Sequence, residues 1–234
     1  MPSRNRRRLT IVGIVVGVIL LGVVGGPFIY IHFFAGSTPA KLPINRGSSS
    51  GTSTTAGSQT QPLAGAWKIS TGSQAGYRVN EVLLGQTTTA VGRTSAVTGH
   101  LQITGTAVDS GSFTVDLTKV HSNKSQRDGQ FQGPIMDTAR FPDATFELTQ
   151  PIQLGTPPGN GQVINVTATG RLTLRGQTRP VTVSLTGRRS GNTIAVSGSI
   201  PVTFSDYGIP NPSQSFVTTE DHGVIEFLLL FDHG

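Results

Sequence analysis

Histidine is the first side chain to test for chemistry, because it is the commonest acid–base group and metal ligand near neutral pH. Of the five histidines, His32 ends an apolar run and needs no catalytic explanation. The other four are scattered, with no two at a metal-binding spacing: His100, His121, His222 and His233. The pair Asp221-His222 is only a turn dipeptide. Histidine chemistry therefore has no support in the sequence.

Other catalytic motifs are also missing from the sequence. No serine stands in a nucleophile elbow and no glycine-rich loop opens a helix, so hydrolase and nucleotide chemistry lack a basis. The chain has no cysteine, which excludes thiolate catalysis, cysteine-ligated zinc and disulfide bonds. We expect a protein that is not an enzyme and that has no catalytic residue, no metal site and no cofactor.

Three arginines have the chemistry to hold a phosphate or a similar head group, since the guanidinium fork matches such oxygens. Arg127 stands beside Asp128 in an irregular segment, where a local ion pair or a helix cap is the simplest explanation. Arg175 and Arg179 flank a turn, where solvation is the simplest explanation. We keep all three as candidate head-group residues.

The excess positive charge lies near the N-terminus. The chain has 18 basic and 12 acidic residues, a net charge of +6. Six of the basic residues precede position 47 and no acid precedes Glu81, so residues 66–234 carry 12 of each sign. A neutral domain lacks the electrostatic footprint of nucleic-acid binding. We expect no nucleic-acid partner.

An uncharged apolar run over residues 9–34 follows the basic residues 1–8. At ~1.5 Å per residue it is long enough for the ~30 Å core of a bilayer. We predict a transmembrane helix over 9–34 in a single-pass cell-membrane protein. The arginines then place residues 1–8 in the cytoplasm and the rest outside. The alternative is a cleaved signal peptide, although its nearest small-residue site, Thr38-Pro39-Ala40, contains an unfavourable proline.

Residues 35–65 are rich in serine, threonine, glycine and proline and have almost nothing to bury, so they predict a flexible tether. Alternation of apolar and polar residues begins with residue 66. It is clearest over Ile164–Leu185, where it breaks at Arg175–Thr178 and resumes. This pattern predicts a β-hairpin with Gly176 at positive φ in its turn. Asp109-Ser110-Gly111 predicts a second hairpin turn.

About eight such strands predict an all-β domain over 66–234, either a barrel or a sandwich. We favour an eight-stranded antiparallel barrel, because several long strands carry glycine on the buried face. A short helix is predicted over residues 124–131, within the irregular segment 122–138. In the last strand, Leu228 and Leu230 face outward and need a cover, either the irregular segment or a partner.

Four phrases carry a family resemblance: Ser73–Val82, Arg127-Asp128, Met136–Phe146 and Gly170–Val181. Together they resemble the YceI-like family of extracytoplasmic lipid-binding barrels. The resemblance implies a lipocalin-like barrel whose interior holds a long polyisoprenoid. The chain departs from the family pattern at Ser73-Gln74-Ala75-Gly76, where a His-Ser pair usually opens the second strand.

The inward faces of the strands are the candidate ligand site, although each of their residues, taken singly, is better explained as plain core. Phe131 and Met136 lie in the irregular segment and are candidates for a lid. Small inward residues are expected to leave room for a lipid: Gly105, Ala107, Ala144, Ala168, Gly170 and Gly198. The candidate lining residues are Tyr77, Val79, Phe113, Val115, Phe131, Met136, Phe146, Leu172 and Phe227.

Two functions follow. The first is a membrane-anchored binding protein that sequesters or carries an isoprenoid or a similar amphiphile. The alternative is a cell-envelope interaction module with a filled core, which would form a homodimer or dock a partner through Leu228 and Leu230.

Overall fold

The structure is a computed structural model that describes residues 38–42, 44, 62–83, 85–213 and 217–234. The predicted cytoplasmic tail and transmembrane helix lie outside these residues. In the described ranges, no helix combines the length and the apolar character that a membrane crossing needs.

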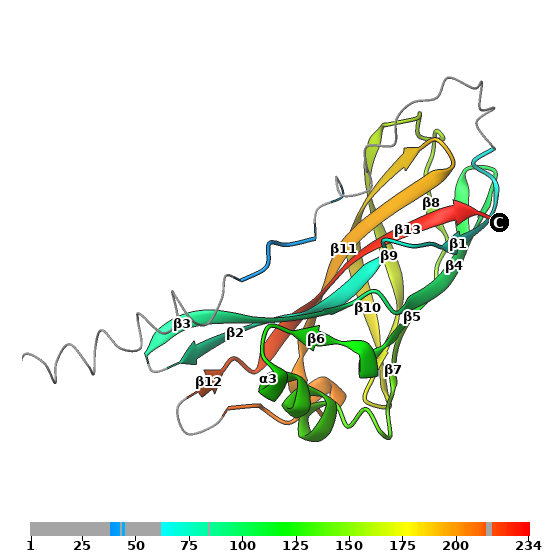
Figure 1. The fold of residues 1–234 in the computed structure, drawn as a ribbon. Coiled ribbons are helices and arrows are strands. Elements are labelled where there is room, and N and C mark those ends of the chain that lie inside the picture. Colours follow the sequence, from blue (N-terminus) through cyan, green and yellow to red (C-terminus); the bar gives the residue numbers. More distant parts are fainter. Residues whose placement is uncertain (1–37, 43, 45–61, 84, 214–216) are drawn as a thin grey trace, which may run out of the picture.

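The regular structure of the described chain is mainly β-strand, with one short α-helix and a few shorter helical turns (Figure 1). The strands are β1 (Gly65–Ile69), β2 (Gln74–Leu83), β3 (Gln86–Thr94), β4 (Val97–Thr104), β5 (Ala107–Asp116), β6 (His121–Ser122), β7 (Asp143–Leu148), β8 (Ile152–Gln153), β9 (Val163–Leu174), β10 (Gln177–Ser190), β11 (Thr193–Thr203), β12 (Val217–Thr219) and β13 (His222–His233). The helical elements are η4 (Leu117–Lys119), α3 (Ser125–Gln130), η5 (Phe131–Ile135) and η6 (Phe204–Tyr207).

The sheet closes on itself as an eight-stranded antiparallel barrel. β1 and β2 both pair with β13 and together form one wall, which is interrupted at residues 70–73. β3 and β4 form the next wall, with β2 against β3 and β1 against β4. The remaining walls are β5, β7, β9, β10, β11 and β13. We call the part walled by β1 and β4 the upper half and the part walled by β2 and β3 the lower half.

The predicted hairpin is confirmed in β9 and β10, which pair from Leu174 and Gln177 outward. Its turn is Arg175-Gly176, with φ of 46° and 74°. Positive φ at both central residues matches the right-handed twist of the strands. The predicted Asp109-Ser110-Gly111 turn is wrong. β5 runs through these residues with a register shift opposite residues 102 and 103, and the true turn contains Gly105 at φ 57°.

The predicted helix is confirmed as α3, which continues into the kinked η5. This insertion joins β5 to β7, and in Figure 1 the green coils lie at the lower end of the barrel. In the lower half β3 pairs with β2 and with the two-residue β6. In the upper half β4 pairs directly with β5. In the lower half the insertion takes the corresponding place beside β3.

The outer face of β13 is covered by the chain itself. Leu228 is 1% exposed. A Cβ on Gly72 would lie 2.9 Å from Leu230 Cδ1, so the turn between β1 and β2 lies over Leu230. The cover over Leu230 is therefore this turn and not the predicted irregular segment 122–138, and a partner at this face stays a prediction. The proposed exposed leucine face for a homodimer is absent at Leu228.

Part of the predicted tether lies against the barrel. Arg78 Nη2 donates to the Pro39 carbonyl at 2.8 Å, and Arg93 Nη2 donates to the Ala40 carbonyl. Leu42 is 8% exposed. We call residues 38–42 the docked segment. A random coil would have no such fixed partners, so these five residues differ from the tether that composition suggests.

Candidate ligand-binding cavities

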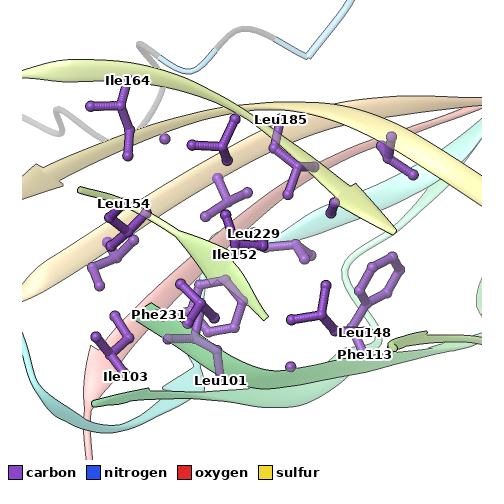
Figure 2. Close-up of a pocket in the computed structure, with 18 of the residues that line it drawn as sticks. Leu101, Ile103, Phe113, Leu148, Ile152, Leu154, Ile164, Leu185, Leu229 and Phe231 are labelled. Atoms are coloured by element: carbon purple, nitrogen blue, oxygen red, sulfur yellow. The ribbon is translucent and has the colours of Figure 1, made fainter. Parts of the chain in front are cut away.

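The barrel encloses two apolar cavities. The upper cavity has a volume of about 130 Å³ and lies in the upper half. Figure 2 shows aliphatic side chains from several strands pointing into it, with Phe113 at one end of the group. Its labelled lining residues are Leu101, Ile103, Phe113, Leu148, Ile152, Leu154, Ile164, Leu185, Leu229 and Phe231.

The lower cavity is larger, at about 730 Å³, within the range of typical small-molecule sites. Its apolar lining comes from the lower strands, the insertion and η6: Tyr77, Val79, Val115, Leu117, Val120, Phe131, Ile135, Met136, Ala144, Leu174, Val202, Phe204, Ile209 and Ile225. Exposed residues also line it, among them Ser125 in α3 and Asn211 in the loop after η6. The lower cavity therefore reaches the surface between these elements.

A row of three phenylalanines separates the cavities. The Phe113 and Phe146 rings are 5.4 Å apart, and the Phe113 and Phe227 rings 5.2 Å. All three line the upper cavity, whereas the next inward residues on the same strands, Val115, Ala144 and Ile225, line the lower one. Among the described residues none lines both cavities. We call Phe113, Phe146 and Phe227 the septum.

The inward glycines make room for the septum rather than for a ligand. A Cβ on Gly170 would lie 2.4 Å from the Phe146 ring, and one on Gly198 would lie 2.7 Å from the Phe227 ring. The prediction that these glycines leave open volume is therefore wrong. It is also wrong for Gly105, which is exposed in a turn. Ala144 and Ala168 do line cavities, the lower and the upper respectively.

The predicted lining residues divide between the two cavities. Tyr77, Val79, Val115, Phe131 and Met136 line the lower cavity, so both lid candidates lie over the larger space. The other aromatic candidates form the septum. Leu172 is 2% exposed and lines neither cavity. As contacts to a ligand, all of these residues stay predictions.

Several lining residues were missed by sequence reasoning. Leu101, Leu174 and Phe231 carried a signal, since alternation places them on inward faces. Ile152 in the short β8 and Ile209 in a loop carried none, because neither belongs to an alternating run.

Of the three candidate head-group arginines, Arg127 lines the lower cavity. Its guanidinium donates to Glu81 Oε1 at 3.0 Å and to Asn123 Oδ1 at 2.8 Å. The ion pair predicted for it with Asp128 is wrong. Asp128 Oδ1 accepts from the Ser122 amide at 2.7 Å and hydroxyl at 2.6 Å, and so ties the helix to β6.

Arg175 and Arg179 lie away from the cavities. Arg175 donates to the Gly208 carbonyl, and the exposed Arg179 donates to the Thr178 carbonyl at 3.2 Å. Within the described part of the chain, neither residue is among those that line a cavity. The structure gives no support to them as head-group residues for a lipid inside the barrel.

Tyr77 combines an apolar and a polar environment at the wall of the lower cavity. Its ring stacks on Phe131, with centroids 5.0 Å apart. Burial raises the pKa of Tyr77 to about 12, and the Asp128 and Glu81 carboxylates add to this while Arg127 opposes it. The phenol is therefore held neutral and is expected to stay so well above its ordinary pKa.

This pKa predicts an alkaline loss of stability. The unfolded chain would ionise Tyr77 near its ordinary pKa of 10.0, whereas the folded chain holds the proton until about 12. The contribution of Tyr77 to the free energy of unfolding is thus fully present below pH 10.0 and is lost as the pH rises to about 12. Between these values the unfolding free energy of the wild type should fall more steeply than that of Tyr77→Phe, which keeps the ring. Parallel curves in urea titrations across this window would contradict the assignment.

These elements define the class of closed eight-stranded antiparallel barrels, here with an apolar interior. Residues 67–231 match the YceI-like domain. The chain therefore belongs to the YceI-like family, as the sequence phrases predicted.

Two curated relatives and two solved structures are similar to this chain. UPF0312 proteins of Vibrio parahaemolyticus and Vibrio campbellii are each 31% identical over 116 residues, which cover 46% of this chain and 58% of each relative. The match thus spans less than two thirds of these relatives. A polyisoprenoid binding domain from Saccharophagus degradans, implicated in plant cell wall breakdown, has a TM-score of 0.59 at 16% identity and covers 73% of this chain and 99% of that one. Burkholderia cenocepacia BcnA has a TM-score of 0.51 at 22% identity, covering 66% and 95%. At these identities the solved structures establish the fold alone.

Proposed function

We propose that this protein binds one polyisoprenoid or similar amphiphile in the lower cavity, with the chain inside and the polar head at the opening. The observation that carries the proposal is the lower cavity of about 730 Å³, which is apolar within and polar at its opening. Each methylene moved from water into such a space contributes about 0.8 kcal/mol. Binding on this scale needs no catalytic group.

The polar opening favours an uncharged or weakly polar head. Arg127 is already paired with Glu81 at 3.0 Å, so a phosphate would have to compete with a carboxylate for it. The neutral Tyr77 phenol adds a hydrogen-bonding group without charge. A prenyl alcohol or a quinone-like head suits these groups better than a diphosphate does.

The name of the Saccharophagus degradans domain supports the isoprenoid class of ligand. We also propose that residues 9–34 anchor the protein in the cell membrane, with the barrel outside the cytoplasm. The lipid would then come from the membrane to which the barrel is tethered. In this role the protein is a carrier or a reservoir and not an enzyme.

The alternative of a filled core agrees less well with the two cavities. It is also weakened by the burial of Leu228, one of the two leucines on which its docking face depended. We therefore retain the ligand-binding function alone.

A cavity-blocking substitution tests the proposal. Ala144 is 7% exposed and lines the lower cavity, so the indole in Ala144→Trp would occupy the space proposed for the lipid. Delipidated full chain in nanodiscs should take up labelled geranylgeraniol, and Ala144→Trp should lower the affinity tenfold or more, about 1.4 kcal/mol.

The matched control is Glu147→Trp on the same strand. Glu147 faces outward, and its ion pair with Arg171 at 3.6 Å is exposed and contributes little. The affinity of Glu147→Trp for geranylgeraniol should equal that of the wild type. Equal affinities for all three proteins would place the binding site elsewhere, and no uptake by the wild type would contradict the proposed function.

A further inference from the structure

The septum divides the barrel along a continuous row of groups. Gly170 on β9 lies under the Phe146 ring, and Gly198 on β11 lies under the Phe227 ring. The Phe113 ring from β5 stands between these two rings, at 5.4 Å and 5.2 Å. The row thus runs from the β9 backbone through three rings to the β11 backbone.

Phe113 and Phe146 lie opposite each other on the paired strands β5 and β7, whereas Phe113 and Phe227 lie on strands that are not neighbours. β5 and β13 are separated by β4 and β1 on one side of the barrel and by four strands on the other. Contact between Phe113 and Phe227 therefore crosses the interior rather than following the wall. The three side chains are 2–8% exposed, so the rings leave little open space between them.

The rings also have little room to withdraw. The Phe146 ring lies so close to Gly170 that even a methyl group would not fit between them, and the same holds for the Phe227 ring over Gly198. Packed interiors resist such displacement, because each ring that moves must displace another. A chain that enters the lower cavity first meets Val115, Ala144 and Ile225, and the septum rings lie directly beyond these residues on the same strands.

We propose that the septum is a stop that sets the length of chain held inside the barrel. This inference rests on the proposed binding function and names the feature that determines its specificity. The lower cavity takes the terminal isoprene units as far as the septum. A chain of matching length then has its polar head at the opening, whereas a longer chain keeps its excess units and its head outside. The upper cavity of about 130 Å³ receives no ligand.

Photo-crosslinking locates the end of the chain directly. The probes are geranylgeraniol and the longer solanesol, each with a diazirine on the carbon farthest from the hydroxyl. Full chain in nanodiscs is loaded, irradiated and mapped by peptide mass spectrometry. In the wild type, both probes should label residues just below the septum, such as Val115, Ala144 and Ile225.

Phe113→Ala removes the central ring of the row. In this variant the solanesol label should shift to upper-cavity residues such as Ile103 and Leu229. Phe231→Ala is the matched control, because it removes a buried ring from the upper cavity but not from the septum. In Phe231→Ala the solanesol label should stay on residues below the septum. Phe113→Leu is the milder variant if the alanine form does not fold.

Each outcome separates the stop from the binding function. Label in the upper cavity of the wild type would overturn the stop and leave the binding function standing. Label below the septum in both the wild type and a folded Phe113 variant would also overturn it, since the rings would not be the limit. Interior labelling by neither probe would contradict the proposed function itself.

Discussion

Replacing Glu226 by glutamine is expected to lower the free energy of unfolding by about 3 kcal/mol, since breaking a buried ion pair leaves uncompensated charge behind. The Glu226 side chain is 7% exposed on the outer face of the barrel. Its Oε1 accepts from Arg93 Nη2 at 2.6 Å and from Arg78 Nη2 at 3.3 Å. Glutamine keeps the shape but removes the charge that both guanidinium groups share. The two arginines are about 15% exposed, which places the effect at the lower end of the usual range.

The same substitution should release the docked segment. Arg78 and Arg93 bind Glu226 and also donate to the Pro39 and Ala40 carbonyls. Gly76 on β2 lies between Glu226 on β13 and Arg93 on β3. Any side chain at this position would clash with Arg93, so the glycine leaves the space through which Arg93 reaches Glu226. Without Glu226 the arginines lose the group that orients them. Limited proteolysis within residues 38–42 should therefore become faster.

Urea unfolding of the full chain measures the first effect, and Glu147→Gln is the matched control. Glu147 pairs with Arg171 at 3.6 Å, but both side chains are more than half exposed. Such surface pairs contribute about 0–1 kcal/mol. Equal losses in the two variants would show that Glu226 acts as an ordinary surface carboxylate, and an unchanged proteolysis rate would remove its role in docking.

Replacing Trp67 by alanine is expected to cost about 3–5 kcal/mol, the usual effect of deleting a buried aromatic ring. Trp67 has no exposed surface. Its Nε1 donates to the Leu63 carbonyl at 2.9 Å, and the Arg189 guanidinium lies 5.8 Å from its ring. Both partners line the upper cavity, so the indole packs directly behind the wall of that cavity.

Trp67 also lies in β1, the strand that closes the upper half by pairing with both β4 and β13. Loss of the indole is therefore expected to loosen this closure. Val163→Ala is the control, because Val163 is 49% exposed and its truncation should change the unfolding free energy by less than about 0.5 kcal/mol. Similar midpoints for the two variants in urea would contradict this role of Trp67 in the closure of the sheet.

The β-structure was predictable because the strand period of two is a local property of the sequence. The hairpin at Arg175-Gly176 followed from alternation on both sides of a turn. The turn predicted at Asp109-Ser110-Gly111 was wrong, because these turn-forming residues lie at a bulge in β5 whose register is fixed by β4. A bulge and a turn use similar residue types, so composition does not separate them.

The cavities were less predictable, because they depend on side chains from strands far apart in the sequence. Alternation placed Phe113, Phe146 and Phe227 inside, but it carries no signal that they meet. Gly170 and Gly198 suggested empty space, whereas each is covered by a ring from another strand. The docked segment was missed for a similar reason. Its composition is that of a linker, and its partners are side chains from β2 and β3.

The central claim is that the lower cavity holds an amphiphile, and the lipid content of the full chain tests it most directly. The protein would be purified from its own host in mild detergent and analysed by native mass spectrometry, followed by solvent extraction of the bound material. We expect one isoprenoid or similar amphiphile per chain in the wild type, and its loss in Ala144→Trp. A wild-type chain recovered empty from its host membrane would contradict the account.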